Sequence, residues 1–150
     1  MKPAAAAVTR EIVSARRFDP APARVFAAFA DPVQLARWWG PNGFVNHIHE
    51  FDLRPGGVWR LTMVAPDGAE FRNLSHFLEV VAPERIVYRH EDSHHGFRMS
   101  MTFAADGAGT RLTWHMDFDS PDECSRVRDV VATANEQNFD RLAAVLAENR

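Results

Sequence analysis

The chain has 150 residues, of which 46% are hydrophobic and 25% charged, ordinary values for a globular protein with one substantial core. The formal net charge of −3 argues against a general nucleic-acid binder and against attachment to anionic membranes by charge. One cysteine, Cys124, excludes an internal disulfide framework, and no apolar run approaches a membrane span. We therefore expect a single cytoplasmic domain over residues 1–150, without a nucleic-acid partner.

The N-terminal part of the chain predicts one strand and then two short helices. Residues 1–8 are too few for a secretion signal and are expected to form a loose tail, and residues 9–18 read as a strand. Two helices are expected over residues 22–30 and 32–38. The second has a capped start, Asp31-Pro32-Val33-Gln34, in which the aspartate caps the helix and the glutamine reaches back to it.

Six further segments alternate apolar and polar residues between Gly-, Pro- and Asp-rich turns, and each predicts a strand: 45–52, 58–64, 70–81, 85–91, 97–103 and 111–118. Their short connections predict an antiparallel meander. In the first segment we take the odd-numbered positions as one face: Val45, His47, His49 and Phe51. In the segment 70–81 both faces stay open, because each of them offers apolar side chains.

The last thirty-one residues predict one long amphipathic helix, over 120–150. Its start, Ser120-Pro121-Asp122-Glu123, has a capping serine and a proline in the first turn. An apolar stripe follows at helical spacing: Cys124, Val127, Val131, Ala134, Leu142 and Val145. Asn135 and Asn138 interrupt this stripe. A buried amide without a partner costs about 1–3 kcal/mol, so backbone, water or a ligand must satisfy both side chains.

Together these elements predict an α+β fold, in which the long helix covers a curved seven-stranded antiparallel sheet. The positions expected to face the helix carry large or flexible side chains: Trp59, Met63, Tyr88, Met99, Met101, Trp114 and Met116. Such side chains fill irregular cores and also line adaptable apolar pockets. Composition alone favours the plain core.

Four sequence pieces, in this order, match a family pattern: Trp38-Trp39-Gly40-Pro41-x-Gly43-Phe44, Phe51-Asp52-Leu53-Arg54-Pro55-Gly56-Gly57-x-Trp59, Pro83-Glu84-Arg85-Ile86 and Gly109-Thr110-x-Leu112-x-Trp114. With them the chain resembles the SRPBCC (START-like) superfamily, and within it the branch named after the activator of the ninety-kilodalton heat-shock protein ATPase. The resemblance covers about residues 9–147. It implies a helix-grip fold, in which the C-terminal helix closes a hydrophobic cavity over the sheet.

His47 and His49 are two positions apart on one predicted strand, so both are expected to point the same way. A zinc site needs such a pair and a third ligand, and no Cys, Asp or Glu completes the set. We therefore predict neither metal nor cofactor. The sequence also lacks a nucleophile elbow, a phosphate-binding loop and a dinucleotide fingerprint, so no catalytic residue is assigned.

The resulting hypothesis is a protein that binds a small hydrophobic molecule between the sheet and the C-terminal helix, as a monomer or homodimer. The residues expected to contact the ligand are Trp39, His47, His49, Phe51, Trp59, Met63, Tyr88, Met99, Met101, Trp114, Asn135 and Asn138. Two alternatives stay open. One is a cyclase- or hydrolase-type enzyme that uses pocket His and Asn groups, and the other is a stress-response protein that interacts with a chaperone.

Overall fold

The computed structural model of the protein describes residues 9–92 and 96–148. Within these ranges the elements are β1 (Glu11–Phe18), α1 (Pro22–Ala30), α2 (Pro32–Trp38), β2 (Val45–Phe51), β3 (Val58–Val64), β4 (Glu70–Val81), β5 (Arg85–Glu91), β6 (Phe97–Asp106), β7 (Gly109–Phe118) and α3 (Pro121–Glu148). The predicted order and types of elements are confirmed. The predicted tail at 1–8 and the last two positions of the predicted helix lie outside the described residues.

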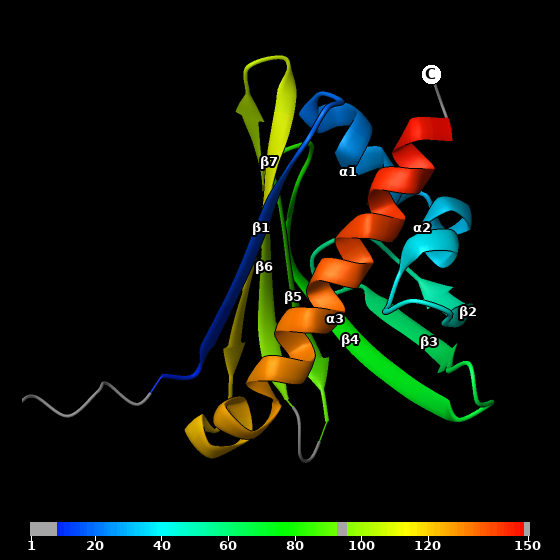
Figure 1. The fold of residues 1–150 in the computed structure, drawn as a ribbon, viewed down its shortest axis with the longest axis vertical. Coiled ribbons are helices and arrows are strands. Elements are labelled where there is room, and N and C mark those ends of the chain that lie inside the picture. Colours follow the sequence, from blue (N-terminus) through cyan, green and yellow to red (C-terminus); the bar gives the residue numbers. More distant parts are fainter. Residues whose placement is uncertain (1–8, 93–95, 149–150) are drawn as a thin grey trace, which may run out of the picture.

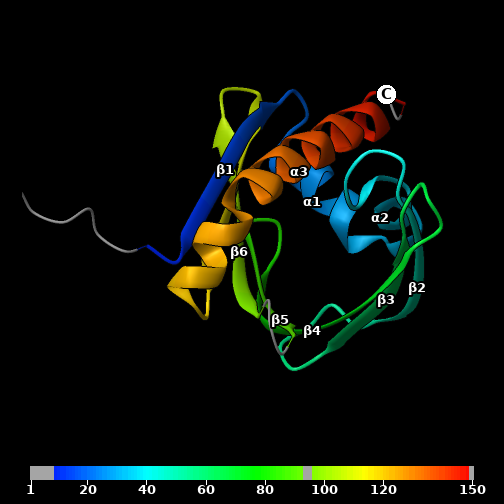
Figure 2. The same ribbon diagram turned by 60° about the horizontal axis from the view of Figure 1, so that its bottom comes forward.

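All seven strands form one antiparallel sheet in the order β1-β7-β6-β5-β4-β3-β2. Consecutive strands from β2 to β7 are neighbours, as short turns dictate. β1 pairs with β7 instead, because α1 and α2 carry the chain across to the far edge of the sheet. The sheet is strongly curved, and the three helices lie across the open side of the curve (Figures 1 and 2).

The long helix α3 begins where the sequence predicts, since the Ser120 hydroxyl accepts a hydrogen bond from the backbone N–H of Glu123 at 3.3 Å. Its buried apolar side chains include Phe139, which the predicted stripe left out and which packs 4.7 Å from Trp114 between ring centroids. Burying a side chain of this size contributes roughly 1.5–3 kcal/mol. Arg16 on β1 adds ion pairs to Glu136 and Asp140, both at 2.7 Å.

The helices α1 and α2 fill one end of the curve with aromatic rings. Phe29 is at the centre of this cluster, and its ring lies 5.4 Å from Trp59 and 6.5 Å from Phe77. The buried indole of Trp38 donates its N–H to the Ala28 carbonyl at 3.0 Å, which joins α2 to α1. The predicted cap of α2 is present, because the Asp31 carboxylate accepts the backbone N–H of Val33 at 3.0 Å. This end of the sheet therefore has a solid core.

Strand facing differs from the prediction in β2. Asn46 and Ile48 face the helices there, whereas His47 and His49 are exposed on the outer side. A β-bulge between Ile48 and Glu50 then shifts the register by one residue and turns Phe51 back inward. The predicted odd-numbered set therefore does not form one face, because a one-residue shift reverses every side chain beyond it.

In β4, whose facing the sequence left open, three even-numbered side chains face outward: Leu74, His76 and Leu78. Ser75 and Phe77 are buried on the inner side, and Asn73 is half-buried beside them. This facing of β4 brings two polar side chains, Asn73 and Ser75, to the concave face of the sheet.

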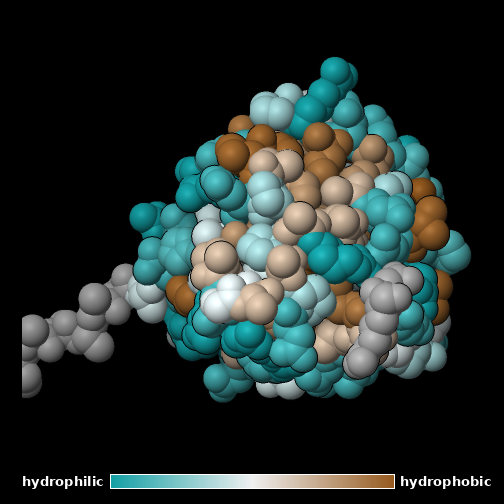
Figure 3. All heavy atoms as spheres, turned by 90° about the horizontal axis from the view of Figure 1, so that it is seen from above, coloured by the Kyte–Doolittle hydropathy of each residue, from teal (hydrophilic) through white to brown (hydrophobic). Residues whose placement is uncertain are grey.

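The surface mixes polar and apolar atoms. The end of the molecule that carries the C-terminal part of α3 shows apolar atoms surrounded by a mostly hydrophilic rim (Figure 3). Across residues 9–92 and 96–148, no helix has both the length and the apolar character that crossing a membrane requires.

Candidate functional site

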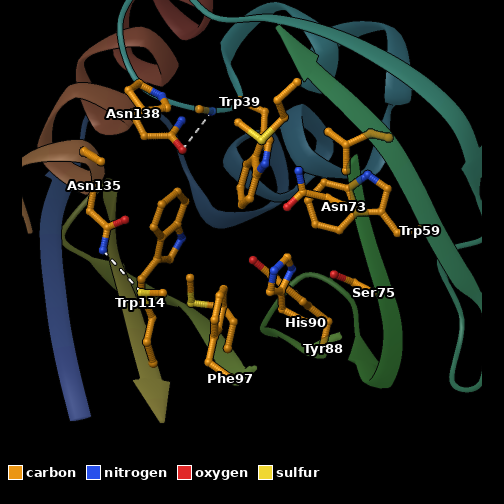
Figure 4. Close-up of a pocket in the computed structure, with 17 residues that line it drawn as sticks. Trp39, Trp59, Asn73, Ser75, Tyr88, His90, Phe97, Trp114, Asn135 and Asn138 are labelled. Carbon is orange, nitrogen blue, oxygen red and sulfur yellow. Dashed lines mark hydrogen bonds between the residues drawn. The ribbon is translucent and has the colours of Figure 1, made fainter. Parts of the chain in front are cut away.

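A pocket of about 180 Å³ lies between the concave face of the sheet and α3, at the end that α1 leaves open. Strands β3 to β7 form its floor and walls, α3 covers it with Ala134, Asn135 and Asn138, and the segment Trp39–Gly40–Pro41 forms part of its rim. Figure 4 shows Trp39, Trp59, Trp114, Tyr88 and His90 around the central space. The wall is mainly apolar, with a few polar groups that could orient a bound molecule.

The structure brings most of the predicted contact residues to this wall: Trp39, Trp59, Met63, Tyr88, Met99, Trp114, Asn135 and Asn138. Further lining residues were not in the predicted set: Gly40, Pro41, Leu61, Asn73, Ser75, His90, Phe97, Met116 and Ala134. His90 alternates with Tyr88 on β5, so the sequence does offer it as an inward-facing side chain, although it was not among the predicted contacts. Asn73 and Ser75 could not be found in this way, because the facing of β4 was undecided.

Four predicted contact residues do not line the pocket. His47 and His49 face outward because of the parity of β2, and the His49 ring lies 2.8 Å from the Thr62 hydroxyl on the outer side. Phe51 is held in the aromatic cluster by Phe29 and Phe77, at 6.0 and 5.7 Å between centroids. Met101 faces inward as predicted but is fully buried in the core.

Both polar atoms of the Asn138 side chain form hydrogen bonds with backbone groups. Its side-chain oxygen accepts the N–H of Gly40 at 3.1 Å, and its amide nitrogen donates to the Trp38 carbonyl at 2.7 Å. This amide therefore positions the pocket rim, and its side chain also lines the pocket. Asn135 differs, because its nitrogen donates to the Ser14 hydroxyl at 3.1 Å while its oxygen has no donor among the described residues.

Arg141, which the sequence analysis did not single out, holds the same rim. Its guanidinium donates to five backbone carbonyls between 2.8 and 3.1 Å: those of Arg37, Trp39, Gly40, Pro41 and Phe44. Among the residues described, no carboxylate forms an ion pair with it. Burial lowers the pKa of Arg141 below the ordinary arginine value. In the sequence this residue resembles any charged position on an amphipathic helix, so nothing local predicts the role.

The rim also depends on Gly40. Its φ of +90° is a left-handed conformation that residues with a side chain rarely adopt. A Cβ atom here would lie 2.6 Å from the methyl carbon of Met63 in the pocket wall. The Asn46 amide adds support from β2, because it donates to the carbonyls of Ala36 and Trp39 at 3.0 and 2.8 Å. The loop after α2 is therefore closely fitted to both β2 and α3.

The chemistry of the wall is nearly neutral. Within residues 9–92 and 96–148, no Arg, Lys, Asp or Glu side chain lines the pocket. Complete burial raises the pKa of Tyr88 far above its ordinary value, so its hydroxyl keeps the proton. The His90 ring stacks on Phe97 with 4.7 Å between centroids. No group of three His, Cys, Asp or Glu side chains in the described ranges is arranged to hold a metal ion.

A curved antiparallel sheet closed by a long C-terminal helix, with a pocket between them, is the architecture of the helix-grip class. The chain belongs to the family described as Activator of Hsp90 ATPase homolog 1-like protein, whose model matches residues 19–147. The resemblance inferred from the sequence is thus confirmed. No curated protein matches the chain.

Solved structures share this fold. A solution structure of a protein from Arthrobacter aurescens has a TM-score of 0.87 and 22% identity, over 96% of this chain and 90% of that one. A protein from Rhodobacter sphaeroides has a TM-score of 0.86 and 21% identity, over 96% and 95%. A crystal structure from Chromobacterium violaceum has a TM-score of 0.77 and 29% identity, over 91% and 96%.

Proposed function

We propose that this protein binds a small hydrophobic molecule in the pocket between the curved sheet and α3. The observation that carries the proposal is the wall itself, where Trp59, Met99 and Trp114 surround an open volume with few polar groups. A dry apolar cavity of roughly 150 Å³ is enough to hold benzene. The volume of about 180 Å³ suits a molecule of one ring with small substituents.

The fold supports the same proposal, since the helix-grip architecture of this family is typically one that binds ligands. The fitted rim adds to it. Asn138 and Arg141 hold the loop after α2 against α3, and this fixes one edge of the opening without filling it. A preformed opening lowers the ordering cost of binding.

The test begins with native mass spectrometry of the purified protein, to detect a co-purifying small molecule, followed by NMR titration with ethylbenzene. Ala134→Phe, which places a ring in the pocket, should weaken ethylbenzene binding about tenfold or more. Ala144→Phe on the exposed side of α3 is the matched control and should leave binding unchanged. If ethylbenzene binds equally well to wild type and Ala134→Phe, or does not bind at all, the proposal fails.

A further inference from the structure

Two indole N–H groups in the pocket wall have no hydrogen-bond acceptor. Trp59 and Trp114 are each 1% exposed, and the Nε1 atom of each is buried without a partner among the described residues. Trp38 shows the usual arrangement, because its buried Nε1 donates to a carbonyl. A buried donor without an acceptor costs about 1–3 kcal/mol, so two at one site require an explanation.

Both indoles border the same space from opposite sides of Trp39, whose ring centroid lies 5.0 Å from that of Trp59 and 5.4 Å from that of Trp114 (Figure 4). The Trp39 ring offers at most a weak N–H···π contact, which is a second-order effect. Tyr88 also lines the pocket, and burial raises the pKa of its hydroxyl, which therefore keeps its proton. The apolar wall therefore holds two indole donors without an acceptor.

The same wall disfavours a charged ligand. With no lining Arg, Lys, Asp or Glu in the described ranges, and with His90 as the one lining imidazole, an ionised ligand would enter without a permanently charged counterion. Removing an ion from water without a partner is far more costly than removing a neutral polar group. A neutral acceptor, by contrast, would satisfy a donor that is already buried.

We propose that the ligand is a neutral molecule of about one ring that carries a hydrogen-bond acceptor, such as a carbonyl or ether oxygen, for the indole N–H of Trp59 or Trp114. This inference rests on the proposed function and adds the chemical class of the ligand. A plain hydrocarbon fills the same volume but leaves both donors unpaired.

The test compares two probes of the same shape, acetophenone and α-methylstyrene, which differ in a carbonyl oxygen. We expect acetophenone to bind about three- to tenfold more tightly, which corresponds to one neutral hydrogen bond. In two-dimensional NMR of isotope-labelled protein, the indole N–H resonance of Trp59 or Trp114 should move downfield with acetophenone alone. The Trp38 indole resonance is the internal control and should not move.

Trp59→Phe and Trp114→Phe each remove one donor and keep an aromatic ring. In the variant that lacks the N–H bonded to acetophenone, the affinities for the two probes should become nearly equal. The affinity for α-methylstyrene should change less than that for acetophenone. If neither variant folds, the wild-type preference and the indole shift decide the question.

The outcomes separate the two proposals. Equal binding of both probes, or acetophenone binding without a shift of either indole resonance, overturns the acceptor inference and leaves hydrophobic binding intact. Tighter binding of phenyltrimethylammonium than of acetophenone also overturns it, because the aromatic rings would then act as a cation site. If no probe perturbs a pocket resonance at millimolar concentration, the proposed function fails and the inference fails with it.

Discussion

Asn138, in the middle of α3, accepts the backbone N–H of Gly40 at 3.1 Å and thereby joins the C-terminal helix to the loop that edges the pocket. Its amide nitrogen completes the link with a bond to the Trp38 carbonyl. Gly40 has a positive φ and no side chain, so its N–H can be brought close to the helix. The position of the rim is thus tied directly to the helix that covers the sheet.

Replacing Asn138 by leucine should destabilise the protein by about 1–3 kcal/mol, because the Gly40 N–H and the Trp38 carbonyl lose their partners inside the protein. Urea unfolding measures the change. Gln137→Ala is the control: it removes an exposed bond to the N–H of Asn42 and should change stability by less than about 0.5 kcal/mol. An Asn138→Leu protein as stable as wild type would show that this amide does not hold the rim.

Arg141→Lys should loosen the same loop. A lysine ammonium has three donors at one point and cannot reproduce a planar guanidinium spread over five carbonyls. We expect a loss of about 2 kcal/mol, together with faster amide hydrogen exchange at Gly40 and Phe44. Arg37→Lys, at an exposed ion pair with Glu148, should have little effect on either measurement. Unchanged exchange in Arg141→Lys would contradict the assigned role.

The only tyrosine in the sequence, Tyr88, should resist ionisation in alkali. Burial raises its pKa in the folded state, whereas the unfolded chain titrates near pH ~10. The folded state therefore binds the proton more tightly, and stability should be fully present below pH ~10 and fall as the pH rises above it, by up to about 1.4 kcal/mol per unit. Tyrosinate absorption should appear only together with loss of native circular dichroism. Urea-unfolded protein is the reference for the titration of a free tyrosine. Tyrosinate formation at pH ~10 in protein that keeps its native circular dichroism would be evidence against this prediction.

Cys124 should be protected from alkylation in the native protein. It is fully buried on α3, where its sulfur accepts a hydrogen bond from Arg128 at 3.3 Å. If the local unfolding that exposes the thiol costs a free energy of roughly 3 kcal/mol, modification by iodoacetamide should be about a hundredfold slower than in urea-unfolded protein. Because the chain has a single cysteine, mass spectrometry gives the extent of reaction directly. Rapid modification of folded protein would show that α3 lifts from the sheet more easily than its packing indicates.

Local signals in the sequence determined the order and the ends of the elements. Asp31 and Ser120 cap the helices they were expected to cap, and the strands between the Gly- and Pro-containing turns appear where the alternation predicts them. These features depend on neighbours a few residues apart, so the sequence carries them directly. The motifs around Trp38 and Trp114 likewise led to the correct family.

The tertiary structure alone decided which side chains reach the pocket. In β2 it is Asn46 and Ile48 that face the helices, so His47 and His49 point outward, and the bulge after Ile48 turns Phe51 back inward. The partners of Asn138 and Arg141 lie about a hundred positions away in the chain. An amide in an apolar stripe predicts that some partner exists, but it does not tell backbone from ligand. That distinction depends on contacts between distant segments, which form only when α3 closes over the sheet.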